Sequence, residues 1–137
     1  MRKSFIVVFT CAFLLLCALI AFGQEADVKL AGYTLFRMRC PSAGYSISER
    51  AAAIQRRAND LLTAEGIDLS TVKVVPIGNE AAIYVAGNLL VTVDNCTAKA
   101  NGTTPIKLAN IWADRLKKIY PVVVPKNPNE PKTHVSH

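Results

Sequence analysis

The sequence predicts an α+β fold, a two-layer sandwich in which two helices cover one face of a four-stranded, largely antiparallel sheet. Two segments repeat apolar residues at helical spacing, and four short segments are rich in β-branched and aromatic residues. Their order along the chain is β-α-β-β-β-α. Because a helix that is apolar on one side must bury that side, we expect both helices to pack on the sheet.

The chain begins with a basic and then apolar segment that is typical of an export signal. Arg2 and Lys3 precede an apolar run over residues 5–22, and small residues precede the junction of Gly23 with Gln24. We expect cleavage at this junction. The run is also nearly long enough to stay in a membrane as an uncleaved anchor, and a lipoprotein cut before Cys17 is a further alternative.

Cleavage would divide the chain into a signal peptide (1–23), a single α+β domain (24–120) and a disordered, proline-rich tail (121–137). It would also lower the formal charge from +6 to +4 by removing the two leading basic residues. The remaining basic residues are scattered, which argues against a nucleic-acid partner. We therefore expect a periplasmic or extracellular protein that meets the membrane only if the leader is retained.

The first predicted strand covers residues 30–40, where Phe36, Met38 and Cys40 alternate with Arg37 and Arg39. This alternation is typical of a strand with one wet side.

The first predicted helix follows, and its start is marked by Ser46 and Glu49 at the spacing of a capping box. Gly66 marks its expected end. Its apolar stripe consists of Ile47, Ala51, Ile54, Ala58, Leu61 and Leu62.

Three further strands are expected between residues 72 and 94, joined by turns at Gly78-Asn79 and Gly87-Asn88. Pro76 cannot donate a ladder hydrogen bond, so its strand should lie at an edge or carry a bulge.

The second predicted helix begins with Thr104 as the N-cap and Pro105 at the first helical position, and Pro121 should end it. Its apolar stripe consists of Leu108, Ile111, Trp112, Leu116 and Ile119.

Two cysteines remain after the leader, Cys40 and Cys96, and an oxidising compartment favours a disulfide between them. The alternative is that both are small buried side chains that never meet.

The residues that could carry chemistry are few. Both histidines, His134 and His137, lie in the proline-rich tail, so the domain offers no imidazole for catalysis or metal binding. No phosphate-binding or dinucleotide motif is present. We therefore expect no catalytic, cofactor-binding or metal-binding residues. Carboxylate catalysis stays an alternative that would use two of Glu49, Asp60, Glu65, Asp94 and Asp114.

Arg115 is the one charge that falls inside a helical apolar stripe, while Arg50 and Arg57 flank the stripe of the first helix. These three arginines are candidate contacts for an anionic ligand or partner, although a packed stem with its head at the sheet edge is the plainer interpretation for Arg115. Asn95 and Asn101 satisfy the glycan acceptor rule, which matters only where the transferase exists.

Two segments, SERAAAIQRRANDLL and VDNCTAKANGTTPIKLANIWADRLKKIYP, together with AGNLLVTV, resemble a small extracytoplasmic module. It precedes the membrane domain in some bacterial, mainly cyanobacterial, mechanosensitive ion channel proteins. The resemblance implies a stand-alone sensing or interaction module and implies no catalytic residues. Conduction does not carry over, because no channel-forming helices follow residue 23.

The sequence thus favours an exported, non-enzymatic binding module of the cell envelope that needs no cofactor. Its partner would be an envelope protein, a cell-wall component or a small ligand. Two alternatives remain: a small carboxylate-dependent hydrolase, and a structural accessory protein that binds through its tail.

Overall fold

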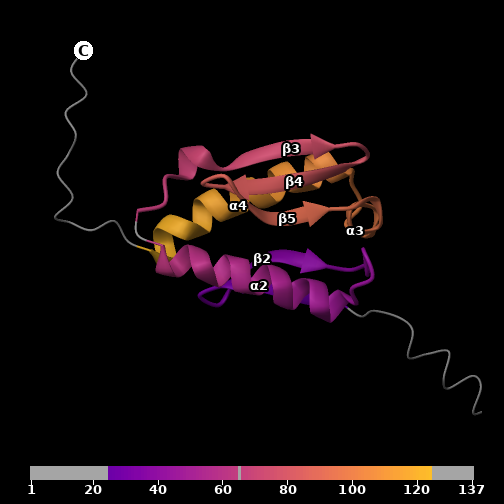
Figure 1. The fold of residues 1–137 in the computed structure, drawn as a ribbon, viewed down its shortest axis with the longest axis horizontal. Helices are drawn as coiled ribbons and strands as arrows, with labels where there is room; N and C mark the ends of the chain where they lie inside the picture. The colour runs from indigo at the N-terminus through magenta and orange to yellow at the C-terminus, as the bar shows by residue number, and fades with distance from the viewer. Residues whose placement is uncertain (1–24, 65, 125–137) are drawn as a thin grey trace, which may run out of the picture.

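The structure is a computed structural model that describes residues 25–64 and 66–124 (Figure 1). The predictions for the leader, its cleavage site, the two histidines and the tail beyond residue 124 lie outside these residues. The elements in chain order are β1 (Ala26–Leu30), β2 (Tyr33–Met38), α2 (Ile47–Thr63), the short 3-10 helix η2 (Leu69–Thr71), β3 (Lys73–Ile77), β4 (Glu80–Val85), β5 (Asn88–Val93), α3 (Asn95–Ala100) and α4 (Pro105–Val123).

The strands form two antiparallel sheets, the hairpin β1-β2 and the three-stranded sheet β3-β4-β5. The predicted α+β class is confirmed, but the predicted single four-stranded sheet is wrong. Strand β1 was not predicted, because Asp27 and Lys29 make its composition less typical of a strand. Val28 and Leu30 alternate with these charged residues and are fully buried, so the segment pairs with β2 and covers the core.

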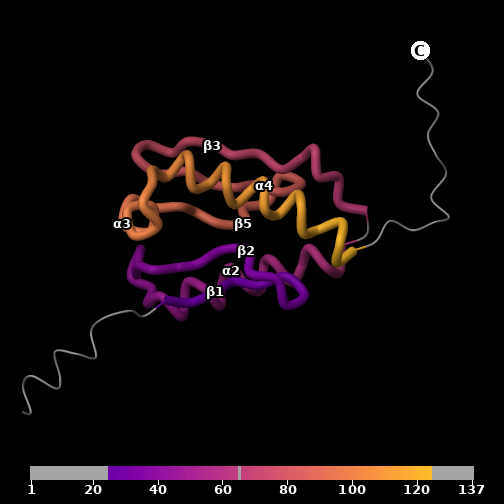
Figure 2. Tube along the Cα trace, turned by 180° about the vertical axis from the view of Figure 1, so that it is seen from behind, coloured from indigo at the N-terminus to yellow at the C-terminus, as the bar shows by residue number. Residues whose placement is uncertain are grey.

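Each helix covers a different group of strands. Helix α2 packs on the β1-β2 hairpin and reaches β5, whereas α4 packs on β3 and β4 and reaches β2. Figures 1 and 2, which view the molecule from opposite sides, show α2 on one side and α4 on the other. The expectation that both helices share one face of one sheet is therefore wrong.

Helix α2 starts as predicted. The Ser46 hydroxyl accepts a hydrogen bond from the Glu49 backbone N–H at 3.2 Å, and the Glu49 carboxylate accepts one from the Ser46 N–H at 2.8 Å. The helix ends at Thr63, before Gly66, although Gly66 does adopt a left-handed φ of 65°.

Tight turns connect the strands. Gly78-Asn79 joins β3 to β4 as predicted. The next turn is shifted by one residue, because Ala86 and Gly87 occupy it with φ of 49° and 79°, while Asn88 already belongs to β5. A type I′ turn requires positive φ at both central residues, so an alanine here sits in a conformation that favours glycine or asparagine.

Strand β3 lies at the edge of its sheet, as Pro76 predicted. Ile77 pairs with Glu80 across the two-residue turn, so Pro76, one position further, directs its backbone nitrogen to the free edge. The edge thereby lacks one donor, which hinders pairing with another strand.

Helix α4 continues past the position where we expected it to stop. Thr104 is its N-cap, without a side-chain hydrogen bond, and Pro105 takes the first position as predicted. Pro121 does not end the helix, which runs to Val123. The lost Pro121 N–H falls in the last turn, and the backbone hydrogen bond from Val124 to Tyr120, at 2.8 Å, closes the final turn.

The short helix α3, between β5 and α4, was not predicted. Asp94 is its N-cap, and the Asp94 carboxylate accepts a hydrogen bond from the Thr97 N–H at 2.8 Å. A side-chain cap of this kind turns the end of β5 into the start of a helix.

The core lies between the strands and the two long helices. Trp112 of α4 packs on Phe36 of β2, with ring centroids 5.0 Å apart, and both side chains are buried. The predicted stripe of α4 is buried at Leu108, Trp112 and Leu116, but Ile111 is 50% exposed, so its assignment to the stripe is wrong. Among the helices of residues 25–124 that the structure describes, none is long and apolar enough to span a bilayer.

Candidate functional site

The three arginines singled out from the sequence all donate hydrogen bonds to strand carbonyls. Arg115 of α4 donates to the Leu35 carbonyl at 3.0 Å, and Arg57 of α2 donates to the Leu90 carbonyl at 3.3 Å. Leu35 and Leu90 are the extra residues of β-bulges in β2 and β5. A bulge leaves its extra residue outside the ladder, so the helices supply donors that the strands lack. The hydrogen bond from Arg115 to a strand carbonyl agrees with the interpretation that its stem packs and its head lies at the sheet, and not with a free anion contact.

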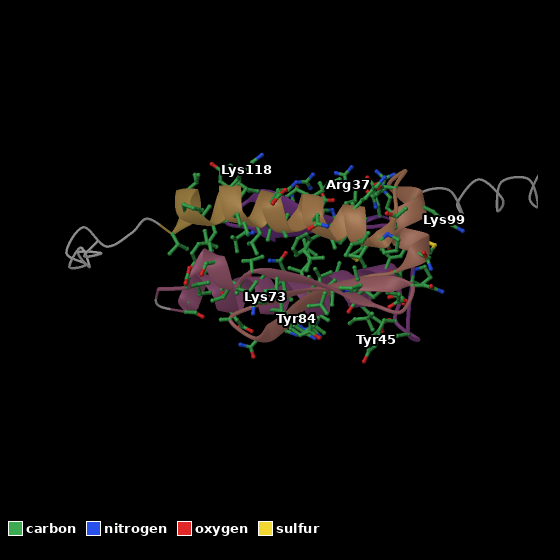
Figure 3. All side chains as sticks on the ribbon, turned by 90° about the horizontal axis from the view of Figure 1, so that it is seen from above. Arg37, Tyr45, Lys73, Tyr84, Lys99 and Lys118 are labelled. Atoms are coloured by element: carbon green, nitrogen blue, oxygen red, sulfur yellow. A yellow bond between two sulfur atoms is a disulfide. The ribbon has the colours of Figure 1, made fainter. Side chains whose placement is uncertain are left out.

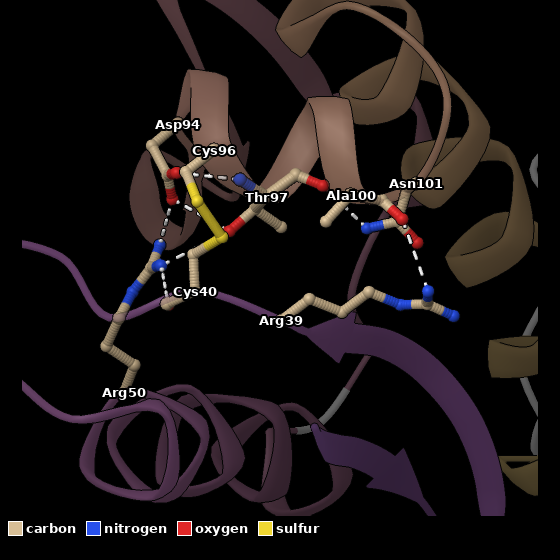
Figure 4. Close-up of a disulfide and its surroundings, with 8 residues drawn as sticks. All are labelled: Arg39, Cys40, Arg50, Asp94, Cys96, Thr97, Ala100 and Asn101. Carbon is tan, nitrogen blue, oxygen red and sulfur yellow. Dashed lines mark hydrogen bonds and ion pairs between the residues drawn. A yellow bond between two sulfur atoms is a disulfide. The ribbon is translucent and has the colours of Figure 1, made fainter. Parts of the chain in front are cut away.

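Arg50 forms the densest polar network (Figure 4). Its guanidinium donates to the carbonyls of Cys40 at 2.7 Å and Thr92 at 3.3 Å, and to the Thr97 hydroxyl at 3.3 Å. It also lies 2.8 Å from a carboxylate oxygen of Asp94. Arg50, at the start of α2, thus joins the end of β2, the edge of β5 and the start of α3.

Asp94 remains charged in this buried position. Burial alone would raise the pKa of Asp94, but hydrogen bonds from the Thr97 N–H and hydroxyl, together with the charge and hydrogen bond of Arg50, outweigh it. The pKa of Asp94 therefore lies below its usual value. A charged acid and a charged arginine, each less than a tenth exposed, form a closed ion pair rather than an open anion site.

A disulfide joins Cys40, just after β2, to Cys96 in α3, with the two Cα atoms 5.9 Å apart. The predicted pairing is confirmed, and Figure 4 shows the bridge beside Arg50 and Asp94. Cys40 is buried and Cys96 is exposed. The bridge and the Arg50 network therefore hold the hairpin and the three-stranded sheet together at the same end of the molecule.

Of the five carboxylates considered for enzyme chemistry, Glu49 and Asp94 are engaged in helix caps, and Glu65 lies outside the described residues. Asp27, which was not among the five, accepts hydrogen bonds from Arg37 at 2.7 Å and 3.2 Å, and Arg37 holds the pKa of Asp27 below its usual value. The backbone N–H and hydroxyl of Ser46 lower the pKa of Glu49 in the capping box. Among the described residues, no three His, Cys, Asp or Glu side chains gather to hold a metal ion.

The glycan acceptor triplets also serve α3. The Asn101 side chain donates to the Thr97 carbonyl at 2.7 Å, so its amide nitrogen is used to end the helix. Asn95 is exposed, but the Thr97 hydroxyl of its triplet is buried and bonded to Asp94 and Arg50.

The side of the three-stranded sheet turned away from α4 carries exposed apolar side chains. Val75 is 38% exposed and Ile77 is 48% exposed, whereas Ile83, on the opposite face of the sheet, is fully buried. Residues directly opposite in an antiparallel pair share a face, so the register extends this surface from β3 to β4. We call it the outer sheet face, and it consists of Lys73, Val75, Ile77, Glu80, Ala82 and Tyr84, of which Ala82 is fully buried.

Figure 3 shows how this face lies in the molecule. The side chains of Lys73 and Tyr84 point away from α4, and Tyr45, which is 57% exposed, projects on the same side. Lys118 and Arg37 lie on the opposite side, with α4. The outer sheet face and α4 therefore present two separate surfaces.

Neither the role of Thr97 as a partner of Arg50 and Asp94 nor the outer sheet face was predicted from the sequence. The spacing of Asp94 and Thr97, three residues apart, matches an N-cap and could have revealed the capped helix. Val75 and Ile77 were predicted only to belong to a strand, because the sequence of one strand does not show which of its two faces a helix will cover.

Residues 27–120 match the family described as Domain of unknown function (DUF8459). The chain belongs to this family. The match covers the described fold from β1 to most of α4. The comparisons with curated proteins and with solved structures returned no match.

Proposed function

We propose that this family member is an exported, non-enzymatic binding module of the cell envelope, and that it captures a protein partner on its outer sheet face. The observation that carries the proposal is the exposure of Val75 and Ile77 on a sheet that α4 covers on its other side only. The solvent side of an antiparallel sheet usually carries polar residues. Contiguous exposed apolar side chains instead mark contact surfaces.

Two tyrosines support a protein as the partner. Tyr84 lies opposite Lys73 in the β3-β4 register, and Tyr45 stands exposed on the same side of the molecule (Figure 3). Tyrosine is enriched in the buried centres of protein interfaces, where its ring packs and its hydroxyl finds a partner. The missing N–H of Pro76 hinders strand addition at the β3 edge, so the face rather than the edge is the contact surface.

Export is supported by the disulfide between Cys40 and Cys96, because such bridges persist in oxidising compartments. A binding role is also consistent with a rigid scaffold, in which the buried Arg50–Asp94 pair fixes the two sheets relative to each other. The resemblance to the extracytoplasmic module of mechanosensitive channel proteins stays a prediction, as does the absence of catalysis.

The proposal is tested with a photo-crosslinking amino acid at Tyr84 and a matched probe at Tyr33, which is 51% exposed at the start of β2. Both proteins are exposed to the native envelope fraction, and the crosslinked products are identified by mass spectrometry. We expect a partner that crosslinks through position 84 and not through position 33, and that disappears when Val75→Asp and Ile77→Asp are added. Identical products from both positions would overturn the proposal.

A further inference from the structure

Helix α4 carries a line of exposed residues in which charge and apolar surface alternate. Lys107, Ile111, Lys118 and Val122 follow one another at spacings of 4, 7 and 4 residues, and we call them the α4 ridge. The exposed Asp114 lies on the same line, three residues after Ile111 and four before Lys118. With 100° of rotation per residue, all four ridge residues fall within about 60° of one another around the helix. Ile111 is 50% exposed and Val122 is 65% exposed, and both lysines are exposed.

The three exposed lysines of this surface, Lys107, Lys117 and Lys118, outnumber its one acid, Asp114. Lys117 lies beside the ridge, and Asp114 is the only acid of α4. Among residues 25–64 and 66–124, the ion pairs involve Arg37, Arg39 and Arg50, and none includes a lysine of α4. The surface is therefore positively charged and attracts anions.

We propose that the α4 ridge docks the domain on an anionic lipid surface. A lysine stem lies along apolar surface while its ammonium reaches the phosphate groups. Ile111, between the two lysines, and Val122, one turn beyond Lys118, enter the boundary with the acyl chains. A soluble polyanion would contact the lysines and gain nothing from Ile111 or Val122. The alternation of charge and apolar surface thus favours lipid.

The geometry of α4 suits a flat surface. A helix of 19 residues is about 28 Å long and lies on the outside of the molecule (Figure 2). The outer sheet face points the opposite way (Figure 3), so docking through α4 leaves it free. This contact is independent of the proposed protein partner and of any retained leader.

The test measures binding of the chain from Gln24 to His137 to lipid vesicles by co-sedimentation. This chain is used because its core consists of residues from Val28 onward and because the apolar residues 5–22 would themselves enter a bilayer. We expect binding to vesicles with about one-third phosphatidylglycerol and at least tenfold weaker binding to pure phosphatidylcholine. Equal binding to both vesicles, or to neither, would overturn the proposal.

Two charge-matched variants locate the contact. Each lysine near an anionic surface contributes roughly fivefold to binding, so Lys107→Gln with Lys118→Gln should weaken it roughly 25-fold. Lys29→Gln with Arg56→Gln removes the same charge at exposed positions outside both proposed surfaces and should change binding less than twofold. Equal losses in the two variants would show a non-specific charge effect and refute the ridge.

Ile111→Gln separates lipid from a soluble polyanion. We expect this variant to bind anionic vesicles at least threefold more weakly and to bind polyphosphate, if at all, as the unaltered chain does. Unchanged vesicle binding would mean that only charge matters, and it would overturn the lipid proposal. Ile111 is half exposed, so its replacement should leave the fold intact, which circular dichroism checks.

Discussion

Replacing Arg50 with methionine tests whether the buried network holds the two sheets together. The guanidinium has four partners: the Asp94 carboxylate, the Thr97 hydroxyl, and the carbonyls of Cys40 and Thr92. Methionine keeps much of the apolar stem and removes every donor. Breaking a buried ion pair by removing one partner costs about 3–5 kcal/mol, because the other charge is left without compensation.

The structure places the expected loss near the lower end of this range. Asp94 keeps the hydrogen bonds from the Thr97 N–H at 2.8 Å and from the Thr97 hydroxyl at 2.9 Å, so its negative charge remains partly compensated. We expect Arg50→Met to lower the free energy of unfolding by about 3 kcal/mol. Urea denaturation measures it, with the fluorescence of the single tryptophan, Trp112, as the signal.

Arg57→Met is the matched control. Arg57 lies two turns along the same helix and also donates to a β5 carbonyl, Leu90 at 3.3 Å. Its side chain is exposed and forms no ion pair with any residue that the structure describes. We expect this change to cost less than about 1 kcal/mol. Equal losses for the two variants, or a loss below 1 kcal/mol for Arg50→Met, would refute the reasoning. Adding Asp94→Asn to Arg50→Met should recover part of the loss, because the unpaired charge disappears.

Four further outcomes follow from the structure. Asp94 has a lowered pKa in the folded chain, so the unfolded chain takes up the proton first and stability should fall as pH drops below about 4; Asp94→Asn should flatten this dependence in acid denaturation curves. Cys40→Ser should cost about 4 kcal/mol in urea denaturation, because the Cys40–Cys96 bridge closes a loop with a separation of 56 residues; two reactive thiols in the unreduced, denatured chain from Gln24 to His137 would contradict the bridge. Ala86→Asn should raise the free energy of unfolding by roughly 0.5–1 kcal/mol, and with it the melting temperature, because asparagine tolerates the positive φ; Ala86→Val should lower both. Trp112 is 2% exposed, so native emission should be blue-shifted and should move to the red on unfolding; a red native spectrum would argue against the packing of α4.

The long helices were predictable because their signals are local. The capping box of Ser46 and Glu49 and the periodic apolar residues of both helices lie within a few turns of each other. The prediction that α4 ends at Pro121 was wrong, because it considered the proline without the apolar residues that follow it. In the last turn the missing N–H leaves one carbonyl unbonded, while Val123 and Val124 pack against the core beyond it.

The split of the sheet and the roles of the arginines were not predictable, because they depend on contacts between distant residues. Arg50 and Asp94 are 44 positions apart, and no local pattern links a helix start to the end of a strand. The bulges at Leu35 and Leu90 likewise emerge only from the pairing of two strands. The three arginines were predicted as contacts for an anionic ligand or partner, but each of them donates to backbone carbonyls.

The hairpin with α2 and the sheet with α4 are two uninterrupted stretches of chain, joined once between α2 and η2. Two copies could therefore exchange their N-terminal stretches and form the same packing in a domain-swapped dimer. Closure of Cys40 with Cys96 inside one chain forbids this exchange, whereas closure between chains locks it.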